Sequence, residues 1–241
     1  LGVMVMGLLA GATGSGPALV AAQDGGRSPR SAAEVRQWLT EISNWGRWGE
    51  GDQIGTLNNV TAEDRIAAAR LVRRGRVFAL GLDLKQKIQS GLFGGRWNLI
   101  HQMLATGTDA VAGAQDGDGQ KYLRYADDAI NMPCQGSTQW DALCHIFLDD
   151  RMYNGFPATD VTVNGAANLG IEKVRDKMVG RGVLLDVARW KGVDCLPDGY
   201  PITGDDLDAC AAAQGVDIRK GDFVIVRTGH QERCLASGDW T

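Results

Sequence analysis

The alternation of helix-like and strand-like segments, without an internal repeat, predicts an α/β or α+β fold. Two apolar runs, 182–188 and 222–228, have the length and composition of buried strands. The segment 61–74 begins with a threonine cap followed by acidic residues, and 203–214 carries acidic residues early, so both are expected to be helices. A chain of 241 residues suits one large domain, or one domain with an arm.

The remaining segments are shorter. Ser31 and Glu34 form a capping-box pattern that predicts a short helix over 31–39. Residues 77–84 alternate as a strand does, and 167–178 are expected to form a further helix. The stretches between these elements are interrupted by glycines or turn residues and are expected to be loops: 45–59, 85–118 and 149–165.

Composition narrows the possible functions. With 22% charged and 44% hydrophobic residues, the chain has an ordinary globular composition. The net charge is -4 and the densest basic cluster, 70–76, ends a predicted helix, so a nucleic-acid-binding function is disfavoured. The sequence has no G-x-S-x-G elbow, and no G-x-G-x-x-G stands between a strand and a helix. Serine hydrolases of that type and dinucleotide enzymes are therefore disfavoured.

The five cysteines are widely spaced and include no C-x-x-C pair. This spacing disfavours a zinc knuckle or a thioredoxin-like site. Most of the cysteines are expected to be buried as small apolar residues. Cys195 and Cys210 could form a disulfide if the protein is exported.

Residues 1–22 carry no charge and pass from an apolar run to small residues. They resemble the later part of a secretory signal peptide, with Val20 and Ala22 before a cut at Gln23. If residues 1–22 are a signal peptide, the protein is expected to be periplasmic or secreted, with no membrane contact in its mature form. A disordered tail or an N-terminal strand is the alternative, and the protein would then be cytoplasmic. The segment is too rich in glycine for a good transmembrane helix, and 23–241 are expected to form a single domain.

The stretch 134–147 carries four polar side chains able to bind a metal or move a proton: Gln135, Gln139, Asp141 and His145. All four positions are odd, so an extended strand would present them on one face. The solvated face of an antiparallel sheet is the simpler interpretation. Against it, glutamine and aspartate are poor strand formers, and the row holds no Lys, Arg or Glu.

The letters GSTQWDALCHIF within this stretch resemble the signature H-x-G-T-H-x-D-x-P-x-H of the cyclase or kynurenine formamidase-like family of metal-dependent hydrolases. In this alignment Gln135 and Gln139 replace the first two histidines, and Leu143 replaces the proline. Asp141 and His145 are retained. The pattern Q-x-x-x-Q-x-D is similar to a branch that includes zinc-dependent trans-dienelactone hydrolases, and stretches between 44 and 240 resemble longer members of the family.

The resemblance implies a swivelling β/β/α fold with a mixed sheet and flanking helices, assembled as a homo-oligomer. It implies metal-dependent hydrolysis of a cyclic ester or amide, or of an N-acyl bond, in a small aromatic-derived molecule. Gln135, Gln139 and Asp141 would hold one or two divalent ions, and His145 would transfer the proton. The branch indicates zinc, whereas oxygen-rich ligands favour harder ions such as Mn²⁺ or Mg²⁺.

Two other functions stay open on the same fold. One is a cyclase or dehydratase of secondary metabolism, and the other is a binding protein that lost its metal with the two histidines. His101, Trp140 and His230 are further candidates for substrate binding, although each could equally be structural. Family members also continue beyond Trp240 with another His and Glu ligand, so the chain is expected to be a fragment truncated at its C-terminus.

Overall fold

The computed structural model describes residues 31–84, 95–117 and 122–240. The leader expected over 1–22 lies outside these residues. The chain forms two compact units. The first unit comprises Leu1–Gly75 and Asp141–Arg233, and the second comprises Arg76–Trp140 and Cys234–Thr241. That 23–241 act as a single domain stays a prediction.

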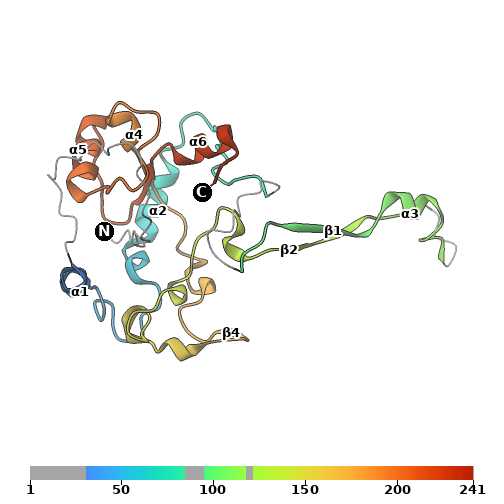
Figure 1. The fold of residues 1–241 in the computed structure, drawn as a ribbon, viewed down its shortest axis with the longest axis horizontal. Helices are drawn as coiled ribbons and strands as arrows, with labels where there is room; N and C mark the ends of the chain where they lie inside the picture. The colour runs from blue at the N-terminus through green and yellow to red at the C-terminus, as the bar shows by residue number, and fades with distance from the viewer. Residues whose placement is uncertain (1–30, 85–94, 118–121, 241) are drawn as a thin grey trace, which may run out of the picture. The chain divides into compact units, whose positions relative to one another are not determined.

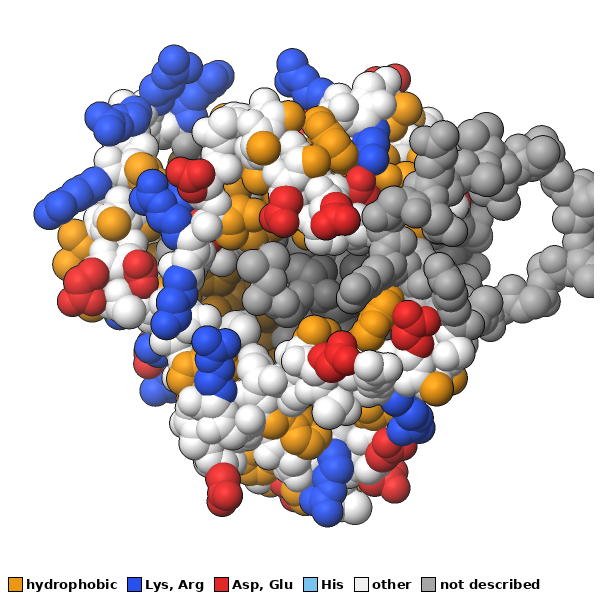
Figure 2. All heavy atoms as spheres, turned by 90° about the vertical axis from the view of Figure 1, so that its left-hand side faces the viewer, with side chains coloured by type: hydrophobic (Ala, Val, Ile, Leu, Met, Phe, Trp, Pro, Cys, Tyr) orange, Lys and Arg blue, Asp and Glu red, His pale blue; other side chains and the backbone are white. Residues whose placement is uncertain are grey.

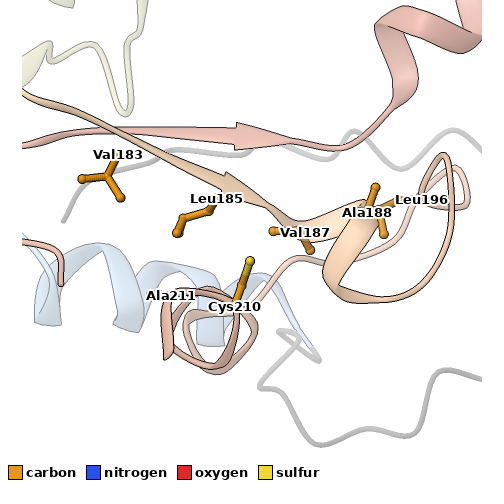
Figure 3. Packing of buried hydrophobic residues seen from close by; sticks show 7 residues of the cluster. All are labelled: Val183, Leu185, Val187, Ala188, Leu196, Cys210 and Ala211. Atoms are coloured by element: carbon orange, nitrogen blue, oxygen red, sulfur yellow. The ribbon is translucent and has the colours of Figure 1, made fainter. Parts of the chain in front are cut away.

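The core of the first unit is built around two parallel strands, β5 (Gly182–Asp186) and β6 (Phe223–Arg227). Both segments were predicted to be strands from their apolar runs, but the full burial expected of them is wrong, because β5 buries only alternate residues and β6 is mostly half-buried. The chain between them contains helices α4 (Val187–Trp190) and α5 (Gly204–Gln214), as a parallel pair requires a long crossover. In Figure 3 the sulfur of Cys210, on α5, points toward strand β5. The buried core comprises Val183, Leu185, Val187, Ala188, Leu196, Cys210 and Ala211.

Local signals at the ends of α5 account for its position. The Thr203 hydroxyl accepts the Asp206 N–H, and the Asp206 carboxylate accepts the Thr203 N–H, which completes a capping box. At the other end Gly215 adopts a left-handed conformation with φ of 65°, which a glycine adopts without strain. The predicted helix over 203–214 is therefore confirmed.

The predicted N-terminal helices are also present. Helix α1 (Ala32–Glu41) begins at Ser31, whose side chain accepts the Glu34 N–H. Helix α2 (Ala62–Ala69) begins at a capping box of Thr61 with Asp64. It ends five residues before the predicted limit of 74. Beyond Ala69 the apolar side chains are exposed, so no packing surface extends the helix.

Short elements surround a second buried cluster of the first unit, formed by Cys144, Met152 and Leu169. The helix expected over 167–178 is wrong, because only a single 3₁₀ turn, η7 (Ile171–Val174), forms there. Leu169 has a φ of 63°, a left-handed conformation that interrupts any helix at this point. The other short elements are η1 (Gly55–Asn59), η5 (Tyr153–Gly155), η6 (Ala158–Asp160), β3 (Val161–Thr162) and β4 (Gly165–Ala166).

The second unit contains an antiparallel ribbon of β1 (Ile100–Ala105) and β2 (Asp127–Asn131), with helix α3 (Gly107–Val111) between them along the chain (Figure 1). The sequence pattern missed this ribbon, since 85–118 were expected to be loop. The strand expected over 77–84 is wrong. Its residues find no partner strand in the described part of the chain, and Val77 is 92% exposed.

Helix α6 (His230–Ser237) follows β6 and crosses the limit between the two units. The described residues form three two-stranded sheets in all, two antiparallel and one parallel. This is a mixed α and β architecture, while the swivelling arrangement with one mixed sheet stays a prediction. All five cysteines are free thiols, so Cys195 and Cys210 form no disulfide, and three of the five are buried. No helix in the described residues is long and apolar enough to cross a membrane.

Candidate functional site

The strand expected over 134–147 is wrong. The segment instead forms two separate 3₁₀ turns, η3 (Cys134–Gly136) and η4 (Leu143–His145). Because the backbone turns at both places, residues two apart do not share a face. Glutamine and aspartate have weak strand propensity, and in the described residues no neighbouring strand pairs with this segment to overcome that weakness.

The four polar residues of this segment are divided between the two units. Gln135 and Gln139 belong to the second unit, where Gln135 is half-buried and Gln139 is exposed. Asp141 and His145 belong to the first unit. The structure therefore brings together the second pair, while the gathering of all four around one ion stays a prediction.

Asp141 and His145 form a close pair across η4. The Oδ1 atom of Asp141 lies 2.9 Å from Nδ1 of His145. The turn creates this contact, because the His145 N–H donates to the Ala142 carbonyl at 3.1 Å. A carboxylate can only accept, so Nδ1 carries the proton of this hydrogen bond and Nε2 of a neutral imidazole is the basic nitrogen. Both side chains are partly exposed, at 46% and 41%, so solvent reaches the pair.

Buried contacts hold η4 in place. Cys144, which lies between Asp141 and His145 in the sequence, is buried, and its backbone N–H donates to the Leu169 carbonyl at 3.3 Å. The Leu169 N–H donates in turn to Oε1 of Gln53 at 2.8 Å. Burial raises the pKa of the Cys144 thiol, and the nearby carboxylates of Glu172 and Asp141 raise it further. Cys144 therefore serves as an apolar anchor for the turn and not as a thiolate nucleophile.

Asn154 fixes the segment 45–59 beside this turn. It adopts a left-handed φ of 59°, and its side-chain oxygen accepts the Gly46 N–H at 2.6 Å. Its amide nitrogen lies within hydrogen-bonding distance of the carbonyl oxygens of Gly49 and Glu50, at 2.9 Å each, and of Asp52 at 3.2 Å. One side chain thus satisfies several backbone groups of a segment that has no regular structure of its own.

Asp52, in the same segment, accepts three hydrogen bonds through its side chain. Its carboxylate accepts the Asn58 amide at 2.6 Å, the Tyr153 hydroxyl at 2.8 Å and the Gly55 N–H at 2.9 Å. Burial alone would raise the pKa of Asp52, but these hydrogen bonds outweigh it and lower the pKa below its usual value. Burial and the hydrogen bond to Asp52 raise the pKa of Tyr153. Asp52 was not among the predicted site residues, although an aspartate three residues before a glycine is a typical signal of a side chain that caps a turn.

The weaker candidates lie elsewhere. His101 was expected in a loop, but it lies on β1 and its Nε2 is 2.7 Å from Oδ2 of Asp128 on β2. Trp140 is 60% exposed and, like His101, belongs to the second unit. His230 is the first residue of α6, where its Nδ1 accepts from the Arg233 guanidinium at 3.0 Å. Their participation in substrate binding stays a prediction.

The ligand chemistry of the predicted metal site is rich in oxygen. In the described residues, no three His, Cys, Asp or Glu side chains gather as a metal site would require. The predicted donors are two amide oxygens and one carboxylate, from Gln135, Gln139 and Asp141. Such a set fits Mn²⁺ or Mg²⁺ better than zinc, which prefers Cys, His and carboxylate ligands.

Comparison with known proteins places the chain in a family. Residues 82–240 match a family model described as "Putative cyclase". Among solved structures, the crystal structure of a novel cyclase is similar, with 42% sequence identity and a TM-score of 0.73. The match covers 79% of this chain and 64% of that one, so the chain spans less than two thirds of the solved cyclase. No curated protein matches the chain. The chain belongs to the cyclase family.

Proposed function

We propose that the protein is a metal-dependent hydrolase of the cyclase family. Its substrate would be a cyclic ester or amide, or an N-acyl compound, derived from an aromatic molecule. The Asp141–His145 pair, 2.9 Å apart, carries the proposal, because it combines a carboxylate with an oriented base on one short turn. Family membership supports an enzymatic role and is consistent with both hydrolysis and cyclisation.

His145 is the proton-transfer group in this proposal. Asp141 holds the proton of the imidazole on Nδ1, so Nε2 accepts a proton from the water that attacks the substrate carbonyl. As the carbon–oxygen or carbon–nitrogen bond breaks, Nε2 returns this proton to the leaving group. An imidazole can both accept and release a proton, so one side chain serves both transfers.

Asp141 has two roles because its carboxylate has two oxygens. Oδ1 contacts His145, and the carboxylate would also bind the metal together with the side-chain oxygens of Gln135 and Gln139. A divalent ion held there would supply Lewis-acid polarisation of the carbonyl and would lower the pKa of water. In addition, the negative charge of Asp141 stabilises the imidazolium form of His145 between the two proton transfers.

A cyclase or dehydratase activity is the second candidate, favoured by the description of the family and of the similar solved structure as cyclases. The two reactions differ in the source of oxygen. Turnover of aromatic lactones and N-acyl arylamines in ¹⁸O-labelled water places label in the product of hydrolysis and none in the product of cyclisation. Absence of label in a turned-over substrate would exclude hydrolysis.

Metal content tests the proposal apart from any substrate. The full-length protein, purified and incubated with Mn²⁺ or Zn²⁺, is expected to retain metal after gel filtration when measured by mass spectrometry of the element. A folded full-length protein that stays metal-free with both ions would contradict the hydrolase and support the metal-free binding protein.

Substitutions separate the two roles at the site. Asp141→Ala is expected to lose bound metal and at least about 100-fold in kcat, because it removes both a ligand and the support of the base. His145→Ala is expected to keep its metal and lose about 10²–10⁴-fold in kcat. Asp176→Ala is the matched control, since Asp176 is an exposed carboxylate that pairs with its neighbour Arg175. Loss of metal in the His145 variant would reverse the assigned roles.

A further inference from the structure

The first unit contains a cavity between helix α2 and the amino ends of the two parallel strands. Its volume is about 190 Å³, and its lining residues are Asp64, Ala67, Ala68, Leu71, Arg181, Arg219, Lys220, Gly221 and Asp222. None of these residues belongs to η4 or to the Asp141–His145 pair. Typical ligand pockets measure about 300–1,000 Å³, so this cavity can hold only a small molecule.

One wall of the cavity is a side of α2 and of the turn that follows it. Asp64, Ala67, Ala68 and Leu71 are three or four residues apart, the spacing of neighbours on one side of a helix. Three of the four side chains are apolar, and Leu71 is 53% exposed. Because alanine side chains are short, this wall leaves space beside the helix for an apolar group.

A second wall is the turn 217–222, which leads into β6. The Arg219 N–H donates to Oδ2 of Asp222 at 2.7 Å, and the Asp222 N–H donates to the Arg219 carbonyl at 3.1 Å. The Arg181 guanidinium donates to the same carboxylate and to the Asp217 carbonyl, at 3.1 Å each. These hydrogen bonds fix the backbone of the turn within the protein itself, so the wall is formed before any ligand binds.

Gly221 allows this turn to approach α2 closely. Its φ is 88°, and a Cβ atom at this position would lie 2.9 Å from the Asn59 carbonyl oxygen and 3.2 Å from Oδ2 of Asp64. A glycine adopts this conformation without strain and has no Cβ to collide. The two walls are therefore held near each other by contacts of the folded chain.

The charged side chains that line the cavity do not balance. They are Arg181, Arg219, Lys220, Asp64 and Asp222, three cations and two carboxylates. The exposed residues Arg70, Arg73 and Arg74, within three positions of Leu71 in the sequence, add further positive charge at this end of α2. A potential of this sign attracts anions. One bound anion with a single negative charge would neutralise the excess charge of the lining residues.

Both carboxylates already have partners. Oδ2 of Asp64 accepts the Thr61 N–H at 2.9 Å and the Thr61 hydroxyl at 2.8 Å, and these hydrogen bonds lower the pKa of Asp64. The Asp222 side chain is 5% exposed and pairs with Arg181. In the described part of the chain, no carboxylate pairs with the guanidinium of Arg219. Arg219 is also exposed, so its guanidinium can bind a ligand from solution.

The apolar and charged side chains of the cavity are separated. On the face shown in Figure 2, apolar side chains lie interspersed with acidic, basic and other polar groups, as is ordinary on a protein surface. In the cavity, the apolar side chains come from α2 and the turn after it, whereas all three cations come from 181–220. Such a separation suits a ligand that has one apolar end and one negative end.

We infer that this cavity binds a small organic anion that combines one carboxylate with an apolar body no larger than a single ring. Arg219 donates two parallel hydrogen bonds to the carboxylate, because its planar guanidinium matches carboxylate geometry. Lys220 supplies a second positive charge. The apolar body lies against Ala67, Ala68 and Leu71 and removes their surface from water. This inference does not depend on the proposed catalytic function.

Fluorine NMR of 4-fluorobenzoate with the full-length protein tests the inference. The probe is expected to bind with a Kd of about 1 mM or lower. The uncharged 4-fluorobenzamide has the same shape and is expected to bind at least about tenfold more weakly, because it lacks the charge that Arg219 recognises. Acetate has the charge without the ring and is expected to compete only weakly. Absence of 4-fluorobenzoate binding, or equal binding of the amide, would overturn the inference.

Variants locate the probe on the protein. Arg219→Gln is expected to weaken 4-fluorobenzoate binding at least about tenfold. Ala68→Leu fills the cavity with a residue that also favours helix, and is expected to weaken binding to a similar extent. Arg175→Gln is the matched control, because Arg175 is an exposed arginine outside the cavity. Circular dichroism checks that each variant keeps its fold.

A variant of the candidate catalytic site separates the two sites. Asp141→Ala is expected to bind 4-fluorobenzoate as the wild-type protein does, whether or not the proposed hydrolase activity is confirmed. Binding that is lost in Asp141→Ala and retained in Arg219→Gln would place the probe at the catalytic pair and overturn the inference. Folded Arg219→Gln and Ala68→Leu variants that bind as tightly as the Arg175→Gln control would overturn it as well.

Discussion

Gln53 connects the segment before η1 with the turn that carries the proposed base. Its Oε1 accepts the Leu169 N–H, and the Leu169 carbonyl accepts the Cys144 N–H of η4. Leu169 is 1% exposed, so water cannot replace the glutamine oxygen without rearrangement. The position of His145, one residue after Cys144, thus depends on a side chain more than 90 residues earlier in the chain.

Gln53→Ala is expected to cost about 1–3 kcal/mol of unfolding free energy, because it leaves the buried Leu169 N–H without an acceptor. Under the proposed function it also lowers kcat more than it changes KM, since η4 loses its support. Chemical denaturation and steady-state kinetics measure the two effects.

Gln53→Glu keeps an acceptor oxygen and is expected to restore both values toward wild type. Gln37→Ala is the control, because Gln37 lies exposed on α1 and bonds to Glu41 one turn along the helix. An alanine variant at Gln53 as stable as the Gln37 control would contradict the bridging role.

Among the secondary-structure elements, β5 buries one face in the core and exposes the other. Leu185 is fully buried and Leu184, its neighbour, is 53% exposed. Leu185→Ala is expected to lower the free energy of unfolding by about 2–5 kcal/mol, because it leaves a cavity between β5 and α5. Leu184→Ala, the same change on the other face of the strand, should cost clearly less. Equal losses in urea denaturation would contradict the packing in Figure 3.

The hydrogen bond between Tyr153 of η5 and Asp52, which lies just before η1, predicts a pH dependence of stability. Asp52 has a lowered pKa in the folded protein, so its contribution is present above the ordinary aspartate pKa of about 3.9 and is lost as the pH falls through the folded value. Tyr153 has a raised pKa, so its contribution is present below about pH 10 and is lost as the pH rises above it. Thermal unfolding monitored from acid to alkaline pH measures both limits.

Tyr153→Phe is expected to remove this alkaline loss and to lower stability at neutral pH, since Asp52 then lacks one hydrogen-bond donor. In the same variant the acid limit moves to higher pH, because the remaining hydrogen bonds lower the pKa of Asp52 less. An unchanged acid limit would show that the Tyr153 hydroxyl does not stabilise the carboxylate.

For the whole molecule, the homo-oligomer implied by the family resemblance predicts a link between stability and protein concentration. The Tm of the wild-type protein is expected to rise with concentration, because association stabilises only the folded chain. Differential scanning calorimetry over a wide concentration range measures this dependence. A Tm that does not change with concentration would contradict assembly by folded copies.

Much of the first unit was predictable from local patterns. The caps at Ser31 and Thr61 place two helix starts, because a capping side chain bonds to backbone groups only a few residues away, and the early acidic residues of 203–214 indicate a third helix. The apolar runs identify β5 and β6 as strands, although only alternate residues of β5 are buried and β6 is mostly half-buried. At the candidate site, the residues Asp141 and His145 were identified, but the geometry that joins them was not.

The incorrect strand and helix predictions share one cause: the structure of these segments depends on contacts with residues distant in sequence. Whether 77–84, 100–105 or 134–147 become strands depends on a partner strand, and only 100–105 finds one, in β2. Leu169 adopts a left-handed conformation, which prevents a helix over 167–178. In this conformation its backbone N–H and carbonyl form hydrogen bonds with Gln53 and Cys144. Local propensity carries no information on such distant contacts.

The sequence by itself determined three helices, the two parallel strands of the core and the resemblance to the cyclase family, because each rests on neighbouring residues or on a short motif. Only the tertiary structure decided that the motif forms 3₁₀ turns, that Asp141 meets His145 across one of them, and that β1 and β2 pair as an antiparallel ribbon. The physical reason is that backbone pairing and burial in these places involve residues distant in sequence, whose contacts exist only after the chain has folded.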